Sequence, residues 1–319
     1  MNAAPLGQPA APTRGDILAA RDRIRPYVRR TPVLDPGAGS LGVEEPLTLK
    51  LELLQHMGSF KPRGAFSKML ASEVPDAGVI AASGGNFGLA VAYAARTLGH
   101  RAEIFVPSTS PEAKIARVRE QGAEVHVIEG YYDDASEAAH ERAAATGARW
   151  MHPFDQPEVV AGQGTIGIEL AEQVPDAETV LVAVGGGGLM GGIAAWFAGD
   201  VRVVAVEPAS CRCLDAALEA GEPVEVPVAG IAADSLGARR VGDIAFAVAR
   251  AHVDRVVLVE DDAIREAQRA IWRDLSLVAE PGGAAALAAV RSGAYAPAPG
   301  ERVVVLLCGS NADPATVTG

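Results

Sequence analysis

Short apolar segments alternate with longer segments of helical spacing along most of the chain. Apolar residues dominate the short segments, which predict strands at 47–53, 79–82, 101–106, 124–128, 150–154, 180–184, 201–206, 256–259 and 303–307. In the longer segments apolar residues recur at helical spacing, which predicts helices at 16–28, 89–98, 111–121, 132–146, 162–174, 261–274 and 283–290. Strands that alternate with helices are typical of parallel sheets covered by helices. The pattern therefore predicts an α/β fold.

The segment 180–199 is uncharged and long enough to imitate a membrane span. It is rich in glycine, however, and no basic flank marks a membrane interface. A buried strand, a glycine loop and a core helix explain it better, so we expect no membrane partner.

Composition limits the class of protein. With 319 residues, of which 49% are hydrophobic and 21% charged, the chain can bury a large core. Its net charge of −12 argues against a nucleic-acid-binding surface, because phosphate contacts need clustered Lys and Arg. Its three cysteines do not make a disulfide framework, and the first 15 residues lack an apolar signal core. We therefore expect a cytoplasmic protein with a flexible N-terminal tail.

Lys61 lies among small and turn-forming residues in the run 58–62, not on a charged helix face. Ser59 can cap a helix, and Pro62 suits the first helical turn. This predicts that Lys61 lies at a strand-to-helix junction above a sheet. A desolvated lysine can lose its proton and become a nucleophile for carbonyl groups. The alternative is an ordinary solvated lysine.

Four consecutive glycines, 185–188, follow the predicted strand 180–184 and precede a predicted helix. Glycines let several backbone N–H groups converge on one phosphate at a helix N-terminus. A rival interpretation is an NAD-dependent oxidoreductase, because Gly186, Gly188 and Gly191 fit G-x-G-x-x-G and Glu207 ends the next strand. Against it, the motif lies in the middle of the chain and leaves Lys61 without a use.

Two more junctions carry polar groups at strand ends. In 83–88, the Ser83 hydroxyl, backbone N–H groups and Asn86 side chain could bind a carboxylate and a phenolate-like oxygen, although a capped helix start is also possible. Cys308 follows the last strand and could equally be a small buried hydrophobe. Parallel sheets bind ligands at the carboxyl ends of their strands. A lysine, a phosphate loop and a carboxylate loop together indicate a pyridoxal phosphate enzyme acting on an amino acid.

Several motifs resemble the serine/threonine dehydratase family, fold-type II pyridoxal phosphate enzymes that include serine racemase. They occur in matching order over nearly the whole chain at 58–65, 83–88, 161–165, 185–188 and 308–311. The resemblance implies two parallel-sheet domains with flanking helices, as in the β subunit of tryptophan synthase. Residues 1–77 and 155–319 would form a large cofactor-binding domain, and 78–154 a small substrate-binding domain.

The resemblance also implies a role for each motif residue. Lys61 would bind pyridoxal 5′-phosphate as a Schiff base and later serve as the general base that removes the α-proton. The other cofactor contacts would come from Phe60 against the ring, Asn86 at its phenolic oxygen, Gly185, Gly186, Gly187 and Gly188 at the phosphate, Cys308 at the pyridine nitrogen, and Glu280 nearby. The substrate carboxylate would bind Ser83, Gly84, Gly85 and Asn86.

The sequence departs from the family pattern at a few positions. Relatives that racemise serine have a serine where this chain has Gly84, so racemisation is not expected. Phe87 stands where relatives often have His, which changes the pocket. Relatives with a divalent cation pair the glutamate at Glu207 with an aspartate, but Cys213 stands there, which puts that metal site in doubt. We also expect no C-terminal regulatory domain, since the chain ends soon after Asn311.

The sequence thus predicts an ammonia-lyase that converts a β-hydroxy amino acid, such as L-threonine or L-serine, to a 2-keto acid and ammonia. A neutral Cys308 would favour elimination over reprotonation. The alternatives are a dehydratase for a bulkier or more polar hydroxy amino acid, the NAD-dependent oxidoreductase, and a cofactor-bearing protein that binds amino acids without turnover. The resemblance also implies a homodimer.

Overall fold

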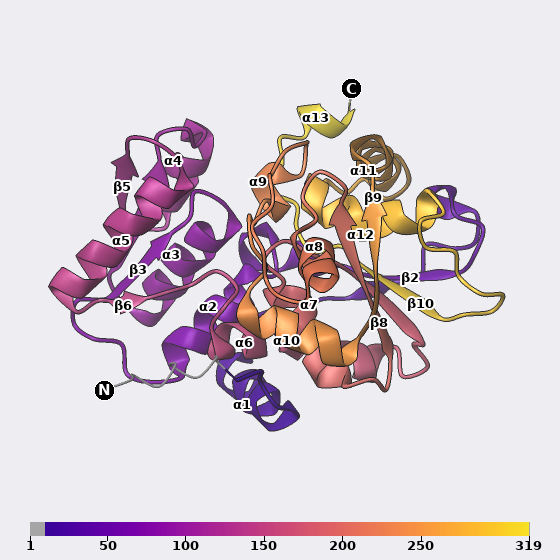
Figure 1. The fold of residues 1–319 in the computed structure, drawn as a ribbon, viewed down its shortest axis with the longest axis horizontal. Helices are drawn as coiled ribbons and strands as arrows, with labels where there is room; N and C mark the ends of the chain where they lie inside the picture. Colours follow the sequence, from indigo (N-terminus) through magenta and orange to yellow (C-terminus); the bar gives the residue numbers. More distant parts are fainter. Residues whose placement is uncertain (1–9, 319) are drawn as a thin grey trace.

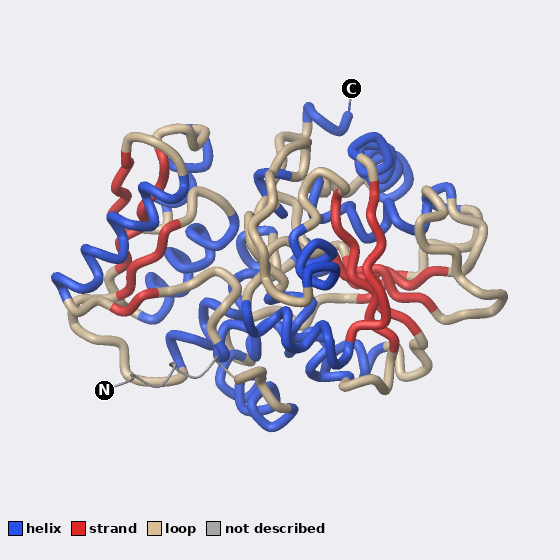
Figure 2. Tube along the Cα trace, viewed as in Figure 1, coloured by secondary structure: helices blue, strands red, loops and turns tan. Residues whose placement is uncertain are grey.

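The computed structural model describes residues 10–318, and its strands form two separate sheets (Figures 1 and 2). The six-stranded sheet has the order β1-β2-β10-β7-β8-β9. Its strands are β1 (Val33–Leu34), β2 (Leu47–Lys50), β10 (Val303–Leu306), β7 (Thr179–Ala183), β8 (Arg202–Pro208) and β9 (Val253–Val259). The four-stranded sheet consists of β5 (Glu124–Ile128), β4 (Ala102–Pro107), β3 (Val79–Ala82) and β6 (Arg149–Trp150), in that order. Neighbouring strands are parallel except β1 and β2, which confirms the predicted α/β class.

Helices connect and cover these strands. They are α1 (Arg14–Ile24), α2 (Lys61–Leu70), α3 (Asn86–Leu98), α4 (Glu112–Glu120), α5 (Tyr132–Thr146), α6 (Pro157–Gln173), α7 (Gly188–Phe197), α8 (Cys213–Ala220), α9 (Ala233–Leu236), α10 (Asp243–His252), α11 (Asp261–Leu275), α12 (Pro281–Arg291) and α13 (Ala315–Thr318). The short 3₁₀ helices are η1 (Ser40–Gly42), η2 (Glu52–Leu54) and η3 (His56–Gly58).

Both faces of the four-stranded sheet are covered. In β3, Val79 and Ala81 pack in one apolar cluster with residues of α3, whereas Ile80 and Ala82 pack in another with residues of α5. Successive side chains of a strand point to opposite faces, so a strand covered on both faces has an unbroken apolar sequence. The apolar segment 79–82 is therefore a central strand, as predicted.

The uncharged segment 180–199, which imitates a membrane span, begins in strand β7 of the six-stranded sheet and continues into α7. All of β7 is buried, and α7 and α12 both contact it. The uncharged stretch 180–199 is therefore a strand, a glycine loop and a core helix, as predicted. Within residues 10–318, no helix is both long and apolar enough to cross a membrane.

Some predicted boundaries were wrong for local reasons. The strand expected at 47–53 ends at Lys50, because the backbone then turns into η2. The strand expected at 150–154 ends at Trp150, shortly before Pro153, which has no N–H for a sheet. Ser59 does not cap α2, since its backbone is extended and bridges to Gly309; the N-cap residue is Phe60.

Candidate active site

Lys61 is the first residue of α2, and the two residues before it are hydrogen-bonded to the segment that follows β10. The Phe60 N–H donates to the carbonyl oxygen of Cys308 at 3.2 Å, and Ser59 pairs with Gly309. Pro62 lies in the first turn of α2, as predicted. The structure thus places Phe60, Lys61 and Cys308 together at the carboxyl end of the six-stranded sheet.

The Lys61 side chain is partly buried between aromatic rings. Its Nζ donates to the Pro153 carbonyl oxygen at 3.0 Å and lies 5.0 Å from the Phe60 ring centre and 5.6 Å from that of Phe87. Burial lowers the pKa of Lys61 to about 8, although the negative charges that Cys308 and Glu280 can carry act in the opposite direction. A neutral Lys61 amine is therefore accessible near physiological pH, which its sequence context predicted.

The glycine loop before α7 accepts no side chains. A Cβ on Gly186 would overlap the ring of Phe154, and one on Gly188 would lie 2.8 Å from the Phe154 carbonyl oxygen. Gly187, the N-cap residue of α7, has a φ of +87°, which favours glycine. The first N–H groups of a helix have no partner inside it, and those of Gly186, Gly187 and Gly188 have no acceptor among residues 10–318. This loop can therefore bind an anionic group such as a phosphate.

A chain of hydrogen bonds joins the two sheets. Asn86, the first residue of α3, donates to Glu280 Oε1 at 2.6 Å, and Asn311 donates to Asn86 Oδ1 at 2.7 Å. Glu280 precedes α12 and is 5% exposed, and this burial raises its pKa to about 7. A Cβ on Gly309 would overlap the Glu280 carboxylate, so the close approach requires glycine there. Asn86 and Glu280, far apart in sequence, thus belong to one hydrogen-bonded network with Asn311.

Cys308 is also buried, and its Sγ lies 3.5 Å from the carbonyl oxygen of Gly282. Burial raises the pKa of the Cys308 thiol above its usual value, and the nearby Glu280 carboxylate adds to this effect. The thiol is therefore neutral.

The loop that follows β3 holds Ser83, Gly84 and Gly85 at the start of α3. The Ser83 hydroxyl accepts from the Gly85 N–H at 3.3 Å. A Cβ on Gly84 would overlap the Ser110 hydroxyl, so Ser110, beyond the end of β4, faces this loop. Sequence reasoning missed both Ser110 and Phe154, because each lies in a loop with no motif of its own.

Glu207 has a different set of neighbours. It is fully buried at the end of β8, and its two carboxylate oxygens accept from the N–H groups of Leu214 and Asp215 at 2.8 and 2.9 Å. Burial raises the pKa of Glu207 to about 7. Cys213 donates from Sγ to the Gly185 carbonyl oxygen at 3.1 Å. Both carboxylate oxygens of Glu207 thus accept hydrogen bonds from N–H groups at the start of α8, and the Cys213 thiol lies next to the glycine loop.

The fold and site point to an enzyme class: a lysine of lowered pKa and a glycine loop whose N–H groups have no acceptor within residues 10–318 both lie at the carboxyl ends of parallel strands of the six-stranded sheet. A family model described as pyridoxal-phosphate dependent enzyme matches residues 24–309. The chain belongs to this family, so it is an enzyme that uses pyridoxal phosphate. The alternative NAD-dependent oxidoreductase is therefore rejected.

Similar proteins support this assignment. The chain is 38% identical over 310 residues to the phenylserine dehydratase of Ralstonia pickettii, covering 96% of this chain and 95% of that protein. It is also 38% identical to the L-threonine ammonia-lyase of Geobacter sulfurreducens, covering 95% of this chain and 76% of that protein.

Solved structures agree in fold. Maize serine racemase superposes with a TM-score of 0.90 at 33% identity, covering 96% of each chain. A threonine deaminase from T.th. has a TM-score of 0.88 at 39% identity, covering 95% of this chain and 99% of that one. The predicted family resemblance, including its fold type, is confirmed.

Proposed function

We propose that the protein catalyses dehydration and deamination of a β-hydroxy amino acid, such as L-threonine or L-serine, to a 2-keto acid and ammonia. The similar proteins named threonine ammonia-lyase, threonine deaminase and phenylserine dehydratase support this reaction class. The observation that carries it is Lys61, whose amine has a lowered pKa, donates to the Pro153 carbonyl oxygen at 3.0 Å next to Phe154, which packs against the glycine loop, and lies 5.6 Å from the Phe87 ring of α3.

The residues present fit pyridoxal phosphate. The phosphate would bind the N–H groups of Gly185, Gly186, Gly187 and Gly188, which donate to no acceptor among residues 10–318, in a loop whose backbone packs too closely against Phe154, Leu236 and Ala245 to carry side chains. Phe60 would pack against the ring, Asn86 would bond its phenolic oxygen, and Cys308 would face its nitrogen. When bound, the cofactor supplies the electron sink that makes the substrate α-proton removable.

Lys61 is the group that we assign to proton transfer. With a pKa near 8, its neutral amine can accept the α-proton at physiological pH and then hold it as an ammonium. Proton transfer needs a base whose pKa lies near the working pH, which burial between Phe60 and Phe87 provides.

Cys308 and the Ser83 loop bias the outcome toward elimination. A neutral Cys308 thiol at the ring nitrogen would not fix a positive charge there, which would favour loss of the substrate β-hydroxyl as water, with a proton taken up by the leaving oxygen, over return of a proton to the α-carbon. Ser83, Gly84, Gly85 and Asn86 would bind the substrate carboxylate through N–H and side-chain donors. Gly84 itself offers no proton to the opposite face of the substrate.

A bulkier substrate is the second candidate. The similarity to a phenylserine dehydratase extends over 95% of that protein, which favours an aryl-substituted serine. Phe87, at the start of α3, is 2% exposed and lines the Lys61 side chain, so an aromatic wall is available there.

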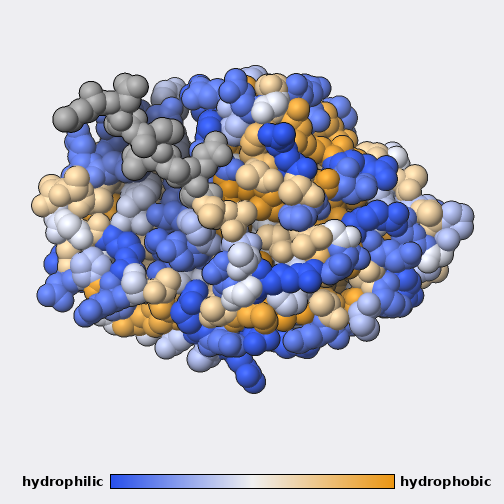
Figure 3. Space-filling view, turned by 60° about the horizontal axis from the view of Figure 1, so that its bottom comes forward, coloured by the Kyte–Doolittle hydropathy of each residue, from blue (hydrophilic) through white to orange (hydrophobic). Residues whose placement is uncertain are grey.

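The domain division and assembly remain part of the proposal. We assign 1–77 and 155–319 to a large cofactor-binding domain and 78–154 to a small substrate-binding domain, supported by the separate sheets. We also propose a homodimer in the cytoplasm. Figure 3 shows apolar side chains between polar ones over the face drawn, so an interface there would be of mixed character. A mass near 32.8 kDa by light scattering would contradict the dimer.

One assay tests the function directly. Purified protein loaded with pyridoxal phosphate is incubated with L-threonine, L-serine and phenylserine, and both keto acid and ammonia are measured. Equal amounts of the two products are expected from at least one substrate. Protein that binds these amino acids without forming either product would be a binder, and the lyase proposal would fail.

A further inference from the structure

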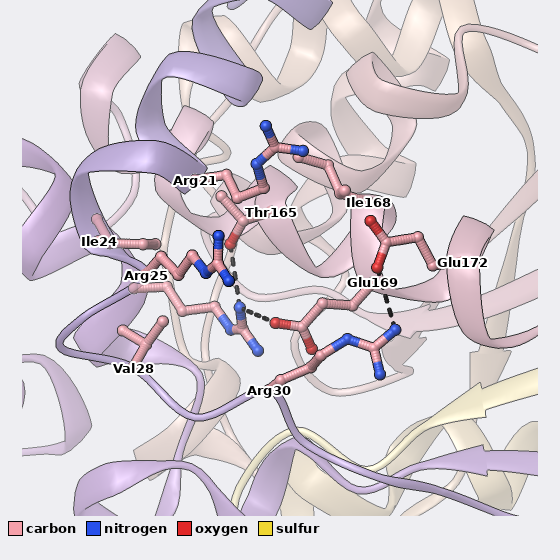
Figure 4. Close-up of a pocket in the computed structure, with 10 residues that line it drawn as sticks. Arg21, Ile24, Arg25, Val28, Arg30, Thr165, Ile168, Glu169 and Glu172 are labelled. Carbon is pink, nitrogen blue, oxygen red and sulfur yellow. Dashed lines mark hydrogen bonds and ion pairs between the residues drawn. The ribbon is translucent and has the colours of Figure 1, made fainter.

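A cavity of about 390 Å³ lies between α1, the segment after it, and α6 (Figure 4). Lys61, the glycine loop and the Ser83 loop do not line it. Four of its ten lining residues are arginines, and apolar side chains from α1 and α6 complete the wall. The cavity is therefore separate from the active site and positively charged in character.

The floor of the cavity is electrically balanced. Arg63 is 1% exposed and pairs with Glu52 at 2.6 Å and with Glu169 at 2.7 Å. Its Nη1 also donates to the Thr165 hydroxyl at 3.1 Å, and Lys50 pairs with Glu169 at 2.6 Å. The acidic groups of the floor are thus already occupied by these two cations.

The rim carries unused positive charge. The Arg25 guanidinium has no hydrogen-bond or ion-pair partner among residues 10–318, and no dashed line reaches it in Figure 4. Within the part of the chain that the structure describes, the Arg21 guanidinium pairs only with its exposed neighbour Asp22, and an exposed ion pair of this kind contributes little to stability. Glu172, the other acidic residue of the cavity, already pairs with Arg30 at 3.0 Å. Arg25 and Arg21 are solvent-accessible, so their guanidinium groups can donate hydrogen bonds to an anion that enters the cavity.

We propose that this cavity binds a small organic anion. Its carboxylate or phosphate group pairs with the guanidinium groups of Arg25 and Arg21, which bind such groups in a planar, forked geometry. Its apolar part lies against Ile24, Val28 and Ile168, which line the same space. A cation is disfavoured, because every carboxylate in the cavity already has a basic partner.

The test is titration calorimetry on protein loaded with pyridoxal phosphate, so that the glycine loop is filled. The probes are inorganic phosphate and butanoate, each at low ionic strength, because screening weakens exposed ion pairs. We expect one site per chain for phosphate. Butanoate can also bind the Ser83 loop that we propose for the substrate carboxylate, so for butanoate we count only the binding that the cavity variants below weaken. Tighter binding of phosphate indicates a phosphate ester as the natural ligand, and tighter binding of butanoate indicates a carboxylate.

Two variants and a matched control assign the site. Arg25→Gln and the double variant Arg21→Gln/Arg25→Gln should raise the dissociation constant of the bound probe by about tenfold or more. The reason is that each variant removes one or two charge-assisted hydrogen bonds to the anion. Arg101→Gln removes an exposed arginine outside the cavity and should leave binding unchanged. Thermal melting confirms that each variant is folded. Absence of binding by both probes, or equal weakening in Arg101→Gln, overturns the proposal.

Discussion

Asn86 and Glu280 are joined by a hydrogen bond of 2.6 Å between the start of α3 and the start of α12. The bond links the helix that follows β3 of one sheet to a helix packed on the other sheet. Burial raises the pKa of Glu280 to about 7, so near neutral pH this carboxyl group is divided between its charged and neutral forms.

This pKa predicts a pH dependence of stability. An unfolded glutamate titrates near about 4.3, so the folded state binds the Glu280 proton more tightly than the unfolded state does. The contribution of the Glu280 proton to folding stability is complete when the pH lies below the unfolded pKa. It falls as the pH rises above that pKa and is lost once the pH passes the folded pKa of about 7. We expect cofactor-free protein to lose about 2–4 kcal/mol of unfolding free energy from this group over that range. Glu280→Gln keeps an acceptor for Asn86 but does not titrate, so its denaturant midpoint should fall less between pH 5 and pH 8. Equal falls in both proteins would contradict the assignment.

Lys61→Ala should fold and lose keto-acid formation by roughly a factor of 10² to 10⁴ or more, since it removes the group that we propose as the general base. Lys68→Ala is the matched control, because Lys68 lies on the same helix but forms a partly exposed ion pair with Glu158. Keto-acid formation and borohydride-stable cofactor incorporation are measured for both. Near-normal turnover in Lys61→Ala would disprove its role.

Gly186→Ala tests the phosphate loop. The added Cβ would overlap the Phe154 ring, so the loop must shift and its N–H groups must diverge. We expect cofactor affinity to fall about tenfold or more and unfolding free energy to fall by about 1–3 kcal/mol. Gly15→Ala in α1 is the control, since a Cβ there lies 3.5 Å from its nearest neighbour. Cofactor absorbance after dialysis measures the retained fraction, and full retention in Gly186→Ala would refute the loop assignment.

The sequence could predict the strands and helices and the position of the glycine loops between them, because periodicity and glycine runs are local signals. The segment 79–82 and the loop 185–188 have the structure expected of them. Sequence alone could not predict contacts between distant loops. Phe154 fills the space beside the Gly186 loop, and Glu280 bonds Asn86, only because the packing of two sheets brings these segments together.

Gly84, which faces the Ser110 hydroxyl, predicts the stereochemical outcome of the reaction. The unmodified protein should convert L-serine or L-threonine to keto acid with little D-isomer, because Gly84 has no proton to return on the face opposite Lys61. D-serine should be a poor substrate, since its α-hydrogen points away from Lys61.

Gly84→Ser should introduce such a proton donor. Gly84 does not have the left-handed φ that penalises a side chain, so its backbone permits serine. The new Cβ would overlap the Ser110 hydroxyl, however, so Gly84→Ser alone must displace that flexible side chain. The double variant Gly84→Ser/Ser110→Ala moves the hydroxyl from one loop to the other without the overlap, and it should form more D-serine from L-serine than Gly84→Ser does.

Chiral chromatography measures both isomers. Rapid racemisation by the unmodified protein would show that another group returns the proton. Ser110→Ala would then identify or exclude the Ser110 hydroxyl as that group, since it lies nearest to the missing side chain.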